Sequence, residues 1–265
     1  MGQVQPVGGG EGKEKKAVRP GGRGAVHGAA AARGPQGRRV VWGDVAGRFV
    51  EPRECLASYL ALEAAEVLAG VKPANLISIT DRTYRCGRNP YRLWKRWGRS
   101  VLESSPLHVH ELEDRGDSVL VLLYLPEALD RLLAASATRA VLRCAGYPEE
   151  VRRAEALDML ARRLATGAFP HEIGVFLGYP LKDVAGFMGL ARIPFTCQGP
   201  WKIYGDPGKS LRLAETYRGC RSRMAAELTC CATPYECLSG GNSRTRLSLR
   251  EYNDTGCHNH VAACR

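Results

Sequence analysis

The chain has 265 residues, 45% of them hydrophobic and 25% charged, which is enough to bury one sizeable core. Its formal net charge is +11, and +6 of this excess lies in residues 1–50, a leader rich in Gly, Ala and Arg. No apolar run reaches the roughly 18 residues of a membrane span, and none follows the basic start as an export signal requires, so we expect a cytoplasmic protein without a membrane partner.

The two ends of the chain are expected to be disordered. Residues 1–50 lack hydrophobic periodicity, and residues 229–265 hold five of the ten cysteines among Ser, Thr, Gly and Asn. Because the chain is neither small nor visibly secreted, we expect reduced thiols. One domain is therefore predicted over residues 51–228, and removal of residues 1–50 is expected to leave thermal stability nearly unchanged.

The first half of this domain opens with a helix and a strand. Apolar spacing predicts a helix over residues 51–68 and a strand over 74–80. A helix over residues 90–103 follows, with Asn89 as its cap and Pro90 at its first position.

A hairpin and two helices are predicted next. Residues 107–112 alternate, and the unbroken apolar run at 118–125 is typical of a central strand buried on both faces. Amphipathic helices are predicted over residues 127–144 and 149–165.

Two Gly-Tyr-Pro sequences, at residues 146–148 and 178–180, separate predicted helices in the second half of the domain. In each, glycine can close one helix in a left-handed conformation while proline starts the next. A short strand over residues 201–204 and a final helix from Asp206 to Leu228 complete the domain. The whole predicts an α/β or α+β fold, with a small mixed sheet that contains a hairpin and is covered by helices. The two breaks are expected to bring distant polar groups to a single cleft.

Several segments in order resemble the bacterial domain-of-unknown-function family 3793, over about residues 56–220. The matching pieces are Leu68–Leu76, the segment from His171 to Phe187, Trp201–Tyr204, Tyr217 and Cys220. Relatives tend to carry a cysteine where this chain has Ala64 and Ala65, and an aromatic residue where it has Pro200. The resemblance implies no particular activity.

No established catalytic signature stands in the sequence, so whether the protein is an enzyme stays open and no cofactor is implied. Polar and aromatic residues within otherwise apolar segments favour a small-molecule or anionic-ligand site, with thiol or metal chemistry as an option. The residues expected at this site are Lys72, Asn75, His171, Glu172, Cys197, Trp201, Lys202 and Tyr204.

Nucleic-acid binding is the alternative function. Residues 172–184 have the spacing of a helix-turn-helix, although the second helix offers only Lys182 and Asp183 as long polar side chains. Arg92, Arg96 and Arg99 share one helical face that could meet phosphates. A structural or interaction protein is the third class, and the oligomeric state stays open.

The cysteine-rich tail offers ligands that zinc accepts, but in separations that match no compact pattern of two ligand pairs. We therefore weigh disorder above a metal site there. The residues concerned are Cys230, Cys231, Cys237, Cys257, His258, His260 and Cys264.

Overall fold

The protein is described by a computed structural model, which defines residues 41–167 and 169–240. Its centre is an antiparallel sheet of three strands, β1 (Ala74–Thr80), β2 (His108–Asp114) and β3 (Ser118–Tyr124), in the order β1-β3-β2. The predicted hairpin is confirmed as β2 and β3, and the apolar run forms the central strand. The sheet is antiparallel throughout rather than mixed, so α+β describes the fold better than α/β.

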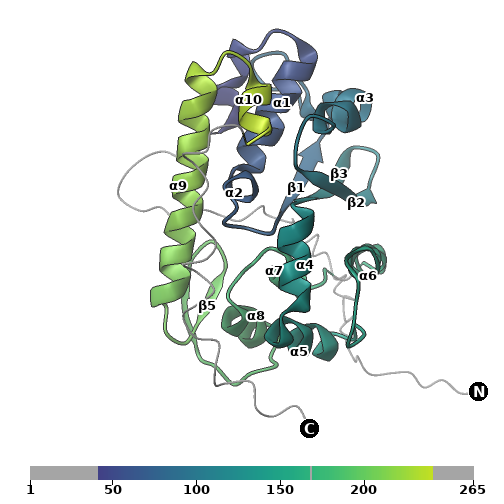
Figure 1. Cartoon of the computed structure of the whole chain (residues 1–265), viewed down its shortest axis with the longest axis vertical. Helices are drawn as coiled ribbons and strands as arrows, with labels where there is room; N and C mark the ends of the chain where they lie inside the picture. Colours follow the sequence, from purple (N-terminus) through teal and green to yellow (C-terminus); the bar gives the residue numbers. More distant parts are fainter. Residues whose placement is uncertain (1–40, 168, 241–265) are drawn as a thin grey trace, which may run out of the picture.

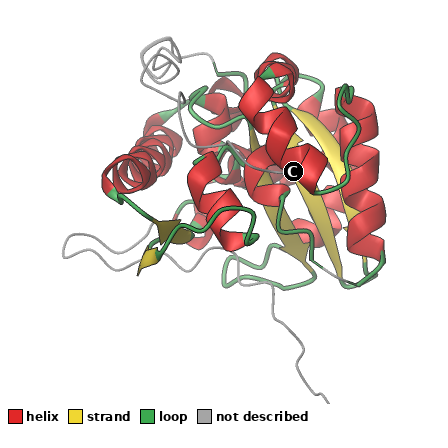
Figure 2. Cartoon of the chain, turned by 90° about the horizontal axis from the view of Figure 1, so that it is seen from below, coloured by secondary structure: helices red, strands yellow, loops and turns green. Residues whose placement is uncertain are grey.

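Helices cover both faces of this sheet (Figures 1 and 2). In chain order they are α1 (Pro52–Glu63), α2 (Ala65–Leu68), α3 (Pro90–Leu102), α4 (Pro126–Ala134), α5 (Ser136–Cys144), α6 (Arg153–Ala165), α7 (Ile173–Phe176), α8 (Leu181–Phe187), α9 (Gly208–Cys230) and α10 (Pro234–Leu238). The 3-10 turns η1 (Trp42–Asp44) and η2 (Ala46–Arg48) precede α1, and β4 (Phe195–Gln198) pairs with β5 (Lys202–Tyr204) in a second, two-stranded sheet.

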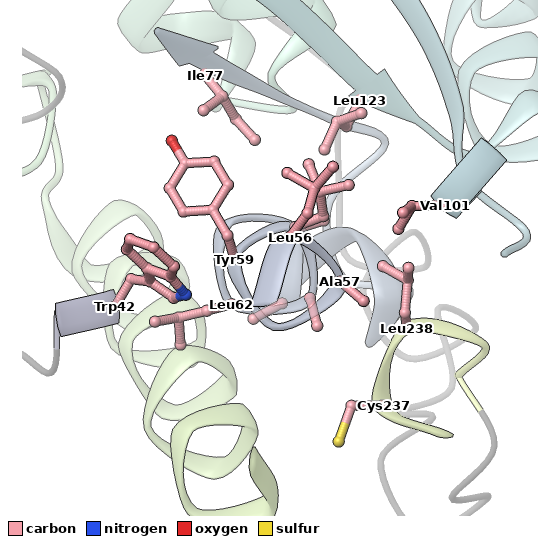
Figure 3. Close-up of a cluster of buried hydrophobic side chains, with 14 of the residues drawn as sticks. Trp42, Leu56, Ala57, Tyr59, Leu62, Ile77, Val101, Leu123, Cys237 and Leu238 are labelled. Atoms are coloured by element: carbon pink, nitrogen blue, oxygen red, sulfur yellow. The ribbon is translucent and has the colours of Figure 1, made fainter. Parts of the chain in front are cut away.

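Successive side chains of the central strand β3 belong alternately to two hydrophobic clusters, one on each face of the sheet. Its Val119, Val121 and Leu123 pack with α1, α3, α10 and the end of α9, whereas Leu120 and Leu122 pack with α4 to α8. This is the two-residue period of a strand buried on both faces. Figure 3 shows the first cluster, in which Leu56 and Tyr59 of α1 approach the sheet residues Ile77 and Leu123.

Four helices differ from the sequence prediction in their bounds. The final helix, predicted from Asp206 to Leu228, is α9 over Gly208–Cys230, and Pro207 rather than Asp206 is at its cap. The helix expected over residues 51–68 is interrupted at Ala64, and the one expected over 127–144 is interrupted at Ala135, whose backbone is extended. Alanine favours helix, so no local propensity signals either break. Helix α6 begins at Arg153 rather than at residue 149. By contrast, Asn89 caps α3 as predicted, accepting a hydrogen bond from the Arg92 amide at 3.2 Å.

The folded part of the chain extends past both predicted bounds. Trp42 and Phe49, placed in the leader by composition, are buried in the first cluster, and so are Cys237 and Leu238 of α10. The apolar positions 42, 45 and 49 have helical spacing that the surrounding glycines obscure, while Thr233 and Pro234 are an ordinary helix start. The rest of the predicted tails, residues 1–40 and 241–265, lies outside the described residues.

Trp42 fixes the amino-terminal segment to α1. Its Nε1 donates to the Ser58 hydroxyl at 3.0 Å, and its ring meets the edges of the Tyr59 and Tyr84 rings. We expect Trp42→Phe to lower the free energy of unfolding by about 1–2 kcal/mol, through the lost hydrogen bond and ring volume. Urea denaturation at pH 7 measures this. Val50→Ala, at a largely exposed position of the same segment, should leave the free energy of unfolding unchanged. Equal losses in the two variants would contradict the role given to Trp42.

Across residues 41–167 and 169–240, no helix combines the length and the hydrophobicity that a bilayer crossing requires.

Candidate functional site

A buried lysine lies in the turn that joins α2 to β1. The Lys72 side chain is buried, and its Nζ donates to the Asn75 side-chain oxygen at 2.6 Å. The same Nζ lies 5.6 Å from the centre of the Tyr179 ring and 5.3 Å from that of Tyr217, close enough for cation–π attraction. Two of the predicted site residues, Lys72 and Asn75, are thus in direct contact.

The second Gly-Tyr-Pro break places Tyr179 against this lysine. Gly178 has a φ of 68°, and a β-carbon there would lie 2.6 Å from the Pro73 side chain, so the break packs on the lysine turn at a distance that only glycine allows. Tyr179 also stacks on Trp201, with ring centres 4.5 Å apart, and the Tyr217 hydroxyl donates to the Gly178 carbonyl at 3.3 Å. Tyr179 and Tyr217 therefore lie against the lysine ammonium, and Trp201 stacks on Tyr179 behind it.

Three charged groups lie around the lysine turn: Glu63 and Glu66, which precede it in the chain, and Arg221 from the distant helix α9. Arg221 of α9 pairs with the Glu63 carboxylate at 2.6 Å and donates to the Leu62 carbonyl at 3.1 Å. Asn75 donates to the main-chain carbonyl of Glu63 at 2.5 Å. Helix α9 runs beside α1 and α2, which brings Arg221 to this place (Figure 1). The Lys72 site is the name used below for Glu63, Glu66, Lys72, Asn75, Tyr179, Trp201, Tyr217 and Arg221.

Two shielded atoms of the Lys72 site have no hydrogen-bond partner among the described residues. They are Oε2 of Glu66 and Nε of Arg221. Burial raises the pKa of the Glu66 carboxyl above its usual value, an effect that the nearby Lys72 and Arg221 charges oppose. Unpaired polar atoms in such positions cost free energy, so these two atoms are candidates for contact with a ligand.

Burial lowers the pKa of Lys72 from 10.5 to about 8, against the raising effect of Glu66. Within residues 41–167 and 169–240, no carboxylate oxygen lies within 4.0 Å of the Lys72 Nζ. The carboxylates in this part of the chain that form ion pairs do so with other cationic side chains. The ammonium is therefore held by one amide oxygen and two ring faces. Cys220 lies near by, buried, with its pKa raised chiefly by burial.

Glu172 belongs to a different cluster, and His171 lies outside both. The buried Glu172 carboxylate lies 3.3 Å from Nη1 of Arg163 and accepts a 3.4 Å hydrogen bond from the Tyr147 hydroxyl, whose pKa is raised by burial and by Glu172. Tyr147 comes from the first Gly-Tyr-Pro break. His171 is exposed, with its ring against the edge of Phe187. Tyr147 and Tyr179 both pack against the second hydrophobic cluster, but they contact different polar groups, Glu172 and Lys72. This corrects the expectation that the two breaks bring the polar groups to a single cleft.

The remaining predicted residues lie around the second sheet. Cys197 packs partly buried against the cluster that contains Trp201 and Tyr217. Lys202 is exposed above the Phe187 ring, and Tyr204 contacts the Phe195 ring edge. Of this group, Cys197 adjoins the Lys72 site and Trp201 belongs to it. Where the structure describes the chain, no side-chain hydrogen bond, ion pair or ring contact joins Lys202 or Tyr204 to this site.

A buried aspartate on α8 ties this second sheet in place. The Asp183 carboxylate accepts hydrogen bonds from Trp201 Nε1 at 2.8 Å and from the Ser210 hydroxyl at 2.6 Å. It also accepts from the Tyr204 amide at 2.9 Å and from Lys182 at 2.6 Å. Both long polar side chains of the expected reading helix are therefore engaged inside the protein.

The arginines of α3 lie on its exposed face. Arg92 pairs with Asp81 at 3.3 Å, Arg96 lies 4.9 Å from the Trp97 ring centre, and Arg99 is exposed in the last turn. Trp94 and Val101 form the buried side of the helix. The predicted shared face of the three arginines is thus accessible, and its use for anions stays a prediction.

Only part of the expected metal set lies where the structure describes the chain. Cys230, Cys231 and Cys237 are at the junction of α9 and α10, whereas Cys257, His258, His260 and Cys264 lie outside the described residues. Among the described residues, no group of three or more His, Cys, Asp or Glu side chains is placed to hold a metal ion.

Sequence reasoning missed five members of the Lys72 site: Glu63, Glu66, Tyr179, Tyr217 and Arg221. Glu63 and Glu66 are the sole charged residues between Glu54 and Lys72, and an acid in such an apolar stretch is a usable signal of a buried pair. Tyr179 belongs to the second Gly-Tyr-Pro sequence, for which only the backbone conformation of the glycine and the proline was considered. Arg221 carries no local signal, since its partner is 158 residues away.

Comparison with known families gives one match. A family model covers residues 60–237, and its description reads protein of unknown function (DUF3793). No curated protein and no solved structure matches the chain.

Proposed function

The chain belongs to the DUF3793 family, whose description assigns no activity, and from the geometry of its lysine turn we propose that it binds a small organic anion at the Lys72 site. The observation that carries this proposal is the buried Lys72 ammonium, which has no carboxylate within ion-pair distance among the described residues. A buried charge is costly unless it is paired, and a bound anion would supply the missing partner.

The surroundings favour an anion with a flat apolar part. Tyr179 and Tyr217 supply ring faces beside the ammonium, and Trp201 packs against both rings. Aromatic walls with few polar groups are typical of small-molecule sites. Asn75, Glu66 and Tyr179 are only half-buried, so the site adjoins solvent. The unpaired Nε of Arg221 is a second donor, and the unpaired Glu66 oxygen is an acceptor for a ligand hydroxyl or amine.

Benzoate is a suitable probe, with the neutral benzamide as its matched control. Titration calorimetry of the full chain at pH 7 should give binding for benzoate and none for benzamide. Because the proton on Lys72 is lost above about pH 8 while benzoate stays ionised, the affinity should fall about tenfold for each pH unit above that value.

Two lysine variants test the location of the site. Lys72→Met should abolish benzoate binding, whereas Lys202→Met, at an exposed lysine beside an aromatic ring, should retain it. Unchanged binding in Lys72→Met, or no binding of benzoate, acetate or phosphate by the unmodified protein, would contradict the proposal.

Nucleic acid is the less favoured partner. Lys182 is held by Asp183 and by the Tyr204 carbonyl, so α8, the helix expected to read bases, presents no free long cation. On α3, Arg92 and Lys95 are paired with Asp81 and Asp114, which lowers the charge available to phosphates. A cytoplasmic location stays our proposal. It is supported by described cysteines such as Cys55, Cys220 and Cys237, which are thiols outside any disulfide and suit a reducing compartment.

A further inference from the structure

Two thiols meet at the junction of α9 and α10. Helix α10 contacts the end of α9, where the thiols of Cys231 and Cys237 are interacting neighbours. Cys237 is buried in the first hydrophobic cluster and Cys231 packs against it, with the Cys231 Sγ donating to the Leu228 carbonyl at 3.9 Å. Neither is in a disulfide. Cys230 is the immediate neighbour of Cys231, but it is exposed, and its Sγ interacts with the carbonyls of its own helix turn at 3.4 and 3.5 Å.

The local backbone explains why the two thiols meet. Helix α9 ends at Cys230, Cys231 has an extended backbone, and Thr233 with Pro234 starts α10. The chain thus reverses within three residues, and the fourth residue of α10, Cys237, returns to the end of α9. Figure 3 shows Cys237 on α10 beside Leu238, at the margin of the cluster.

We propose that Cys231 and Cys237 form an oxidative modification site, in which a small disulfide such as oxidised glutathione converts the two thiols into an intramolecular disulfide. The half-buried Cys231 thiolate attacks the small disulfide, forming a mixed disulfide and releasing one glutathione thiolate. The buried Cys237, after losing its proton to solvent, then attacks the Cys231 sulfur and releases the second glutathione. Two protein thiols are oxidised, and one small disulfide is reduced to two thiols.

The second step is the slower one. Burial, together with the neighbouring Cys231, raises the pKa of the Cys237 thiol, so little thiolate is present near neutral pH. Because the thiolate is the nucleophile, ring closure should accelerate about tenfold for each pH unit from 7 to 9. In a reducing compartment such a pair stays reduced until an oxidant is present, as is usual for a redox-sensing thiol pair.

Closure would fasten α10 to the end of α9. Helix α10 packs on α1, and its Leu238 carbonyl accepts a hydrogen bond from Ser105 at 3.0 Å. Arg48 already holds the same junction, through the carbonyls of Leu228 and Cys231 at 2.7 Å each. The disulfide would therefore add a covalent bond to the hydrogen bonds and packing that already hold α10 against α1.

The test uses the full chain, incubated with oxidised glutathione, alkylated and digested with trypsin. Cys230, Cys231 and Cys237 fall together in the peptide 224–244, while Cys257 and Cys264 fall in another. We expect this peptide to lose two hydrogens and to carry one alkyl group, on Cys230. Cys230→Ser is the matched control and should close as the unmodified protein does.

Cys231→Ser and Cys237→Ser should not close and should keep a glutathione adduct on an unpaired cysteine. Because Cys237 is buried, circular dichroism melting must first show that its variant is folded, and Cys231→Ser provides the independent test if it is not. Closure retained in Cys231→Ser, closure lost in Cys230→Ser, or glutathione adducts alone in the unmodified protein at pH 9 would overturn the proposal.

Discussion

Lys72→Met is expected to raise the free energy of unfolding at pH 7, by as much as about 3 kcal/mol, because the folded protein holds this lysine at a pKa of about 8 instead of 10.5. The difference measures how strongly burial disfavours the ammonium. Methionine has a similar length and no charge, so it removes the penalty while it keeps contact with the Tyr179 and Tyr217 rings.

The pH dependence has a definite sign. Below pH 8 Lys72 is protonated in both the folded and the unfolded chain, and the penalty is present in full. Between pH 8 and 10.5 only the unfolded chain keeps the proton, so the stability of the unmodified protein rises with pH relative to that of the variant, at about 1.4 kcal/mol per pH unit. The gain from Lys72→Met should accordingly disappear by about pH 10.5.

Urea denaturation of both proteins from pH 7 to 10 gives this difference directly. Taking the difference removes the titration of other groups, such as Tyr179, whose pKa burial raises to about 12. Lys202→Met, at an exposed site, should change stability by less than about 0.5 kcal/mol at any of these pH values. A Lys72→Met variant that is less stable and shows no pH trend would mean that contacts within the protein offset the free-energy cost of burying the Lys72 ammonium.

This result would also bear on function. A buried charge that lowers stability is retained where activity requires it, and stabilising substitutions at such places are commonly made at the cost of function. A Lys72→Met variant that is more stable and has lost benzoate binding would connect the two properties in one residue.

Local patterns in the sequence were enough to predict much of the fold. Strand β1 has the predicted bounds, the apolar run became the central strand, and Asn89 with Pro90 starts α3. These features depend on neighbouring residues, through side-chain alternation and helix capping. The Lys72–Asn75 contact spans three residues and was within reach of the same reasoning.

Long-range pairing could not be predicted in this way. Glu172 was placed beside Lys72 because both stand in polar positions of apolar segments, yet it pairs with Arg163. The helix breaks at Ala64 and Ala135 carry no propensity signal, so tertiary packing decides them. Which polar group meets which depends on how α9 crosses α1, and that crossing is not encoded in any short window of sequence.

Arg221→Met should be strongly destabilising, by about 3 kcal/mol, because it removes one partner of a largely buried ion pair and leaves the other. The Arg221 side chain is 11% exposed and that of Glu63 is 21% exposed. Two guanidinium nitrogens contact the carboxylate, at 2.6 and 3.3 Å, and one also binds the Leu62 carbonyl. Methionine leaves these oxygens of α1 without a donor.

The control for Arg221 lies one turn earlier on the same helix. Arg218 pairs with Glu215, but the two side chains are 51% and 68% exposed, so Arg218→Met should cost at most about 1 kcal/mol. Arg221→Lys keeps the charge but not the two-point contact, and should fall between the two. Urea denaturation at pH 7 ranks the three variants. Equal losses in Arg218→Met and Arg221→Met would show that the long helix α9 is held to α1 by apolar packing alone, with no contribution from the ion pair of the Lys72 site.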